Sequence, residues 1–183
     1  MQPHRFWLAS AALLFLVAVA GPVAAAERSI KDFYGEYVGR TVSGGDKALQ
    51  GRDINVTIKP LKRGFNVSWS TISHRANGDA KRKSYSIDFR RTNRDNIFQS
   101  AMRKDVFGQE APNDPMKGDP YVWARIKGDT LSVYALIVAD DGSYDMQAYH
   151  RTLTKDGMTL RFSRTTEGDE KKVITGTLKR VVE

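Results

Sequence analysis

The sequence contains no cysteine, and its 183 residues include only three histidines. Without cysteine the chain has no disulfide, no thiolate metal ligand, no cysteine nucleophile and no lipid attached to a processed N-terminal cysteine. With so few histidines, the side chains that most often supply acid-base catalysis or zinc ligation are scarce. The fold must therefore be held together by a hydrophobic core rather than by covalent or metal cross-links.

Sequence motifs of enzymes are missing as well. There is no G-x-S-x-G elbow, no glycine-rich phosphate loop and no H-E-x-x-H pair. His74 lies in a polar loop, and His150 has no second histidine or carboxylate at a supporting spacing. Asp140, Asp141 and Asp145 lack the full ligand series of a calcium loop and fit turn chemistry instead. The sequence therefore predicts no catalytic residue, no metal site and no cofactor, and it gives no positive support for an enzyme.

Residues 1–26 have the order of a secretory signal peptide. Basic Arg5 precedes the apolar run Phe6–Ala20, and a Gly-Pro pair then leads to small residues that end at Ala26. A transmembrane anchor is the alternative, but the apolar run is interrupted within about 20 residues. We expect cleavage near Ala26, which predicts a periplasmic or secreted protein with no membrane span in its mature chain.

Residues 27–183 consist of short segments of alternating polarity separated by glycine, aspartate and asparagine turns. In one of them, apolar Phe65, Val67 and Trp69 alternate with Asn66 and Ser68. A period of two predicts strands with one dry face, and the turn residues supply the conformations that tight hairpins need. The predicted strands cover residues 36–42, 54–58, 65–71, 84–90, 96–102, 121–126, 130–139, 143–152, 158–165 and 171–182.

Residues 103–120 interrupt this rhythm. They contain three prolines and two glycines, which argue against a regular element because proline cannot donate to a sheet. We expect a lid, a crossover or a mobile flap there.

The strand pattern predicts an all-β fold in a single domain. About eight to ten antiparallel strands in up-and-down order must hide two sheet edges, and closing the sheet on itself is the usual solution. A closed barrel is our first prediction, and a β-sandwich is the alternative. The interior of a barrel of this strand number is filled by side chains or holds one small ligand.

The segment of residues 30–39, IKDFYGEYVG, resembles the opening of lipocalin-like, or calycin, β-barrels. In that family a short turn precedes a G-x-W or G-x-Y element, and the aromatic residue closes one end of the barrel beneath a basic residue of the last strand. Gly35 and Tyr37 match the element, with tyrosine in place of the commoner tryptophan, and Arg180 is the candidate for the basic residue. The resemblance covers these residues and the strand order only. It implies a barrel that binds a small apolar or amphipathic molecule rather than a particular catalyst.

Aromatic and polar residues on the predicted strands are candidates for ligand binding. Aromatic side chains suit a flat or chain-like apolar ligand, and Arg125 and His150 would orient its polar head. Alternation places Tyr121, Trp123 and Arg125 on one face, so either the arginine is interior and paired or these aromatics face outward. A purely structural role in the core is the alternative for the aromatic residues. The candidates are Trp69, Tyr121, Trp123, Arg125, Tyr134, Tyr144 and His150.

The charge of the chain is strongly positive. The formal net charge is +8, and it falls to +7 without residues 1–26, whose one charged side chain is Arg5. Basic residues gather at Lys81–Lys83 and Arg90–Arg94. In an exported protein this excess favours an anionic envelope component rather than nucleic acid, although solubility alone is the other explanation. The leading hypothesis is a binding protein for a small hydrophobic or amphipathic ligand; the alternative is an envelope interaction module that uses a basic outer surface and holds no interior ligand.

Overall fold

Ten antiparallel strands form a closed barrel in the computed structural model, which describes residues 28–43, 51–74, 78–100, 103–104, 110–111 and 113–182. Barrel strands that follow one another in the sequence are neighbours in the wall, and the last strand closes the barrel by pairing with the first. This confirms the predicted all-β, up-and-down fold and excludes the alternative of a sandwich. The strands are β1 (Gly35–Ser43), β2 (Arg52–Leu61), β3 (Gly64–His74), β4 (Ala80–Arg91), β5 (Ile97–Ser100), β8 (Tyr121–Lys127), β9 (Thr130–Val138), β10 (Tyr144–Thr154), β11 (Gly157–Thr166) and β12 (Asp169–Arg180).

The ten barrel strands correspond one to one to the ten predicted strands, but residues 103–120 differ from the prediction. Strands β6 (Arg103–Lys104) and β7 (Glu110–Ala111) form a separate two-stranded sheet, and the short 3-10 helix η2 (Pro115–Lys117) follows. The Asp114 side chain caps this helix by accepting a hydrogen bond from the Met116 amide at 3.0 Å. The expectation that no regular element forms here is wrong to that extent. The predicted signal peptide lies outside the described residues, and no helix within them is long and apolar enough to span a membrane.

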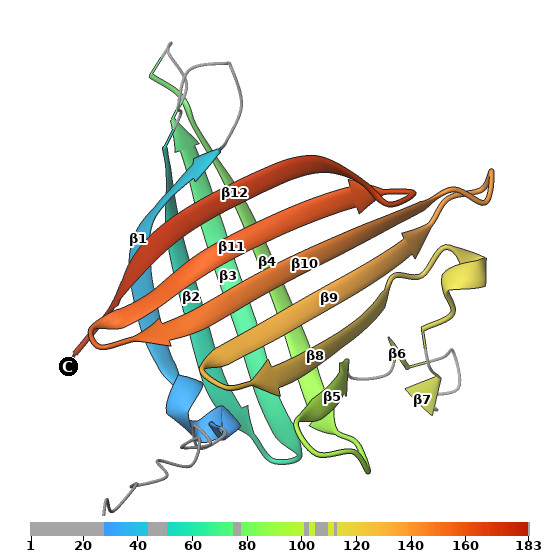
Figure 1. Cartoon of the computed structure of the whole chain (residues 1–183), viewed down its shortest axis with the longest axis horizontal. Helices are drawn as coiled ribbons and strands as arrows, with labels where there is room; N and C mark the ends of the chain where they lie inside the picture. The colour runs from blue at the N-terminus through green and yellow to red at the C-terminus, as the bar shows by residue number, and fades with distance from the viewer. Residues whose placement is uncertain are drawn as a thin grey trace, which may run out of the picture.

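The two sides of the barrel cross each other. Figure 1 shows β1–β4 running steeply across β8–β12, with the 3-10 helix η1 (Ile30–Phe33) at the end of the barrel where the β2–β3 hairpin turns. We call this the closed end. The opposite end, where β1 and β3 finish and β2 and β4 begin, is called the far end.

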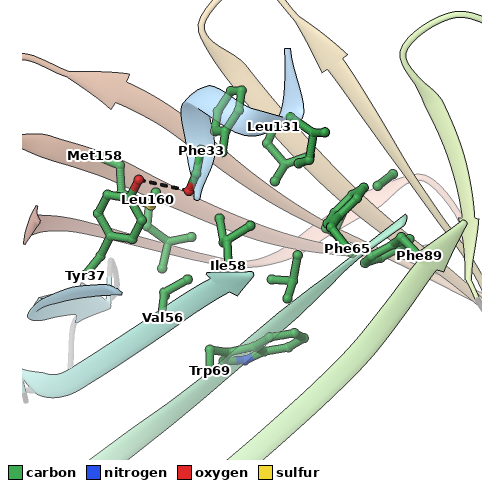
Figure 2. Close-up of a cluster of buried hydrophobic side chains, with 14 of the residues drawn as sticks. Phe33, Tyr37, Val56, Ile58, Phe65, Trp69, Phe89, Leu131, Met158 and Leu160 are labelled. Carbon is green, nitrogen blue, oxygen red and sulfur yellow. Dashed lines mark hydrogen bonds between the residues drawn. The ribbon is translucent and has the colours of Figure 1, made fainter. Parts of the chain in front are cut away.

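Tyr37 closes the barrel beneath η1. Its hydroxyl donates a hydrogen bond to the Phe33 carbonyl at 2.9 Å (Figure 2) and accepts one from the Arg180 guanidinium at 2.6 Å. Arg180 also donates to the Asp32 carbonyl at 2.8 Å, and its guanidinium lies 5.2 Å from the centre of the Tyr37 ring. The predicted arrangement of an aromatic residue under a basic residue of the last strand is therefore present at the closed end.

Alternate residues of the strands point inward and form one hydrophobic core. Phe65 stacks on Phe89 with ring centres 5.1 Å apart and meets the edge of Phe98 at 4.9 Å. Burial of each such side chain contributes about 1.5–3 kcal/mol to folding. Side chains thus fill the half of the barrel next to η1. Figure 2 shows part of this core, including Phe65 and Phe89. The fully buried apolar and aromatic members are Phe33, Tyr37, Val56, Ile58, Phe65, Val67, Phe89, Ala124, Ile126, Leu131, Val133, Met158 and Leu178.

Among the described residues, the wall has the fewest backbone pairs at β5. In that part of the chain β5 pairs with β4 over three residue pairs and with β8 over three more, whereas β10 and β11 pair over ten. Within the described residues, β4 is paired on both sides only at Phe89 and Arg90, and its earlier part is paired with β3 alone. Among the described residues, the section of wall beside the first part of β4 therefore has fewer backbone hydrogen bonds than the rest of the barrel.

Candidate ligand-binding chamber inside the barrel

Four aromatic side chains meet inside the barrel near its far end. Trp69 and Tyr85 are cross-strand partners on β3 and β4, and Tyr149 and Phe162 are cross-strand partners on β10 and β11. Trp69 stacks on Tyr85 at 5.1 Å, and Tyr149 lies 4.6 Å from Phe162. The two pairs come together across the interior, where Trp69 and Tyr149 are 5.2 Å apart although β3 and β10 are not neighbours in the wall. We call these four residues the aromatic cluster.

A chamber of about 160 Å³ lies against the aromatic cluster. Its lining is apolar where it meets the core and polar toward the far end. For scale, an engineered cavity of about 150 Å³ in another protein holds a benzene molecule. The chamber therefore has room for roughly one ring. Besides the cluster, the lining residues are Thr41, Arg52, Ile54, Thr71, Lys83, Arg151, Leu160, Lys172 and Ile174.

Arg151 is the buried charge of the chamber. It lies on β10 two residues after Tyr149, and only 1% of its surface is exposed. Its guanidinium is 5.3 Å from the centre of the Trp69 ring and 5.6 Å from that of Tyr149. Among the described residues, neither Nε nor Nη1 has a hydrogen-bond partner. Burial lowers the pKa of Arg151 from its usual value to about 10, which still leaves the group charged at neutral pH.

The rest of the chamber adds positive charge and no negative charge. Arg52, Lys83 and Lys172 belong to its lining, and none of the lining residues that the structure describes is an aspartate or glutamate. Lys83 comes from the basic run that we expected on an outer surface, so part of that charge faces the interior. A carboxylate elsewhere on β10, Asp145, is already bound: it pairs with the Arg164 guanidinium and accepts a hydrogen bond from Thr166 Oγ1 at 2.5 Å.

Of the seven candidate residues from the sequence, Trp69 lines the chamber and the others lie on the outer wall. Trp123 and Tyr134 are cross-strand partners on β8 and β9, and their rings stack at 5.0 Å. Tyr134 also meets the edge of the His150 ring at 5.8 Å. Trp123, Tyr134 and His150 alternate along their strands with buried Ala124, buried Val133 and partly buried Tyr149, which face inward. Tyr121 and Arg125 share the face of Trp123, and Tyr144 shares that of His150, so for Tyr121, Trp123 and Arg125 the outward alternative is the one observed.

His150 points outward, and its contacts there fit a structural role. Its Nδ1 lies 2.8 Å from the Ser132 hydroxyl. Partial burial, with a smaller effect from the charge of Arg161, lowers the pKa of His150 below its ordinary value. Within the described part of the chain, no three histidine, aspartate or glutamate side chains come close enough to hold a metal ion. Asp141 accepts hydrogen bonds from the Ser143 amide at 2.9 Å and hydroxyl at 2.6 Å, which is the turn chemistry predicted for it.

Sequence reasoning missed Tyr149 and Arg151 as lining residues because it placed the other face of β10 toward the interior. Both faces of this strand carry large side chains, so the alternation of residues did not determine which face points into the barrel. The register with β9 fixes it, since Tyr149 pairs with buried Val133 and Arg151 with buried Leu131. The residue in the sequence that could have identified the inward face is Leu153. It lies on the same face of β10 as Tyr149 and Arg151, and it packs against the core.

Two wider hollows, of about 900 and 860 Å³, lie on the outer wall and are lined mainly by outward-facing side chains. They are surface grooves, whereas the chamber is bounded by the core. No protein-family model, curated protein or solved structure matches this chain.

Proposed function

We propose that the protein is a lipocalin-like binding protein, periplasmic or secreted, that holds a small apolar or amphipathic molecule inside its barrel. The observation that carries the proposal is the chamber beside the aromatic cluster, because a pocket lined by aromatic groups with a few polar ones is the common form of a small-molecule site. The closure of the other end by Tyr37 and Arg180 supports the family resemblance.

The size of the chamber limits the ligand. Pockets for drug-sized molecules measure about 300–1,000 Å³. At about 160 Å³, the chamber favours a molecule of roughly one ring, or a correspondingly small end of a longer molecule. Long-chain lipids would have to leave most of their chain outside, because core side chains fill the interior toward the closed end.

Access to the chamber leads past Tyr85. This side chain is 49% exposed, whereas its stacking partner Trp69 is 7% exposed. Tyr85 therefore forms the boundary between the chamber and solvent.

Tryptophan fluorescence tests the proposal, because Trp69 borders the chamber and Trp123 lies on the outer wall. In protein carrying Trp7→Phe where residues 1–26 are retained, Trp123→Phe leaves Trp69 as the reporter and Trp69→Phe leaves Trp123. We expect titration with a small aromatic probe, such as benzoate or toluene, to change the Trp69 emission in a saturable way and to leave the Trp123 emission unchanged. A saturable change at Trp123 alone, or none at either position, would refute interior binding.

A further inference from the structure

The surroundings of Arg151 carry an inference about the chemical class of the ligand, and this inference rests on the proposed function. The side chain is 1% exposed, and in the described structure no carboxylate pairs with it. A buried charge is normally paired, and buried hydrogen-bond donors normally have acceptors. Arg151 meets neither expectation, so the chamber holds a strong hydrogen-bond donor without an acceptor or a negative charge to pair with it.

The rings around Arg151 do not replace that complement. Trp69 and Tyr149 lie against the guanidinium at 5.3 and 5.6 Å, and their π-faces attract the cation. A ring face accepts hydrogen bonds only weakly, and guanidinium N–H groups point outward in the plane of the group. The aromatic contacts therefore hold the guanidinium in place while leaving Nε and Nη1 without acceptors.

The remaining charges of the chamber favour a negatively charged ligand. Arg52, Lys83 and Lys172 line it together with Arg151, and no lining residue that the structure describes carries a negative charge. A neutral ligand would leave Arg151 unpaired, and a cationic ligand would be repelled by four like charges. An anion supplies the acceptors and the opposite charge in one group.

The shape of the partners narrows the choice of anion. A guanidinium presents a planar fork of donors that matches the two oxygens of a carboxylate. Beside it, the aromatic cluster offers ring faces, and the volume of about 160 Å³ allows roughly one ring.

We propose that the chamber binds a small aromatic carboxylate, with the ring against the aromatic cluster and the carboxylate oxygens accepting hydrogen bonds from Arg151. Arg52, Lys83 and Lys172 attract the anion to the chamber, and Arg151 fixes its orientation.

Three probes of nearly equal size test which sign of ligand charge the chamber prefers: benzoate, benzamide and benzylamine. They are titrated at pH 7 into the Trp123→Phe protein described above, in which Trp69 emission is the readout and the chamber is unaltered. We expect benzoate to bind at least tenfold more tightly than benzamide, and benzylamine to bind more weakly still. Equal affinities for benzoate and benzamide, or a preference for benzylamine, would overturn the carboxylate inference while leaving interior binding intact. Binding of none of the three, nor of toluene, would overturn the proposed function together with this inference.

Variants then assign the preference to a residue. Arg151→Met keeps the length of the side chain without its charge, Arg151→Lys keeps the charge without the planar fork, and Arg125→Met removes an exposed arginine from the outer wall. We expect Arg151→Met to bind benzoate and benzamide equally, Arg151→Lys to retain a reduced preference for benzoate, and Arg125→Met to match the wild type. A full preference in folded Arg151→Met protein would contradict the assignment, and if that variant fails to fold, Arg151→Lys against Arg125→Met gives the comparison.

Discussion

At the scale of single residues, Arg151 is the point where stability and binding oppose each other. The guanidinium is buried without an acid, and its pKa is lowered because burial disfavours the charged form. A side chain chosen for stability alone would be apolar here, as the neighbouring inward positions Val133 and Leu131 are. Functional sites are the places where natural proteins carry such unfavourable groups.

This reasoning predicts that Arg151→Met raises the stability of the ligand-free protein. Replacing a buried charge by an apolar side chain of similar length is often neutral or stabilising by about 1–4 kcal/mol, and loss of the two ring contacts offsets about 2 kcal/mol or less of that gain. Urea denaturation followed by circular dichroism measures the change, with Arg125→Met as the control that should stay within about 0.5 kcal/mol of the wild type. A clear loss of stability in Arg151→Met would mean that the arginine is a structural clamp between Trp69 and Tyr149.

At the scale of elements, an ion pair joins β10 to β11 at the ends of the strands away from the closed end. Asp145 of β10 pairs with Arg164 of β11 and also accepts a hydrogen bond from Thr166. The hydrogen bond from Arg164, followed by that from Thr166, lowers the pKa of the Asp145 carboxyl. These contacts favour the ionised form of Asp145 in the folded state.

The lowered pKa predicts how this contribution depends on pH. Because the folded-state pKa of Asp145 lies below the unfolded value of about 3.9, the unfolded state binds more protons between the two values. The stabilisation is therefore fully present above about pH 5 and is lost as the pH falls through the folded-state pKa. We expect the urea midpoint of Asp145→Asn to lie below that of the wild type at pH 6 and the difference to narrow steadily as the pH falls below about 4. A difference that is the same at both pH values would show that the Asp145 charge contributes nothing.

The elements themselves were predictable from the sequence, but their inward faces were only partly so. Strand β3 was placed correctly because its buried apolar residues Phe65, Val67 and Trp69 fall on one face. Strand β10 carries Tyr149 on one face and Tyr144 on the other, so alternation alone did not fix which face is inside. Only its pairing with β9, a long-range property, placed Arg151 in the interior.

At the scale of the whole molecule, the chamber exists because strands that are distant in the wall meet across the barrel. Trp69 of β3 reaches Tyr149 of β10, and no local pattern in either segment encodes this contact. The sequence therefore predicted a barrel and its turns, and it predicted the Tyr37–Arg180 closure through a family resemblance. It did not predict whether the interior is filled, because that depends on side chains from both sides of the closed sheet.

The uneven wall of the barrel leads to a prediction about its dynamics. Among the residues that the structure describes, β5 has three residue pairs on each side, whereas β11 pairs over ten residues with each of its neighbours. Regions with fewer hydrogen bonds open at lower free energy. We expect the amides of Phe98 and Gln99 in β5 to exchange with solvent deuterium faster than those of Leu160 and Phe162 in β11.

Ligand binding should change that difference in a specific way if the thin section of wall beside β4 is the route into the chamber. A ligand that binds only the closed barrel slows every opening that releases it. Benzoate at a concentration that saturates the wild type should therefore slow exchange at Phe98 and Gln99 in the wild type, and should slow it less in Arg151→Met, which we expect to bind benzoate more weakly. Slowing of β11 alone, without any change in β5, would place the route of entry at the far end of the barrel instead of through this section of wall.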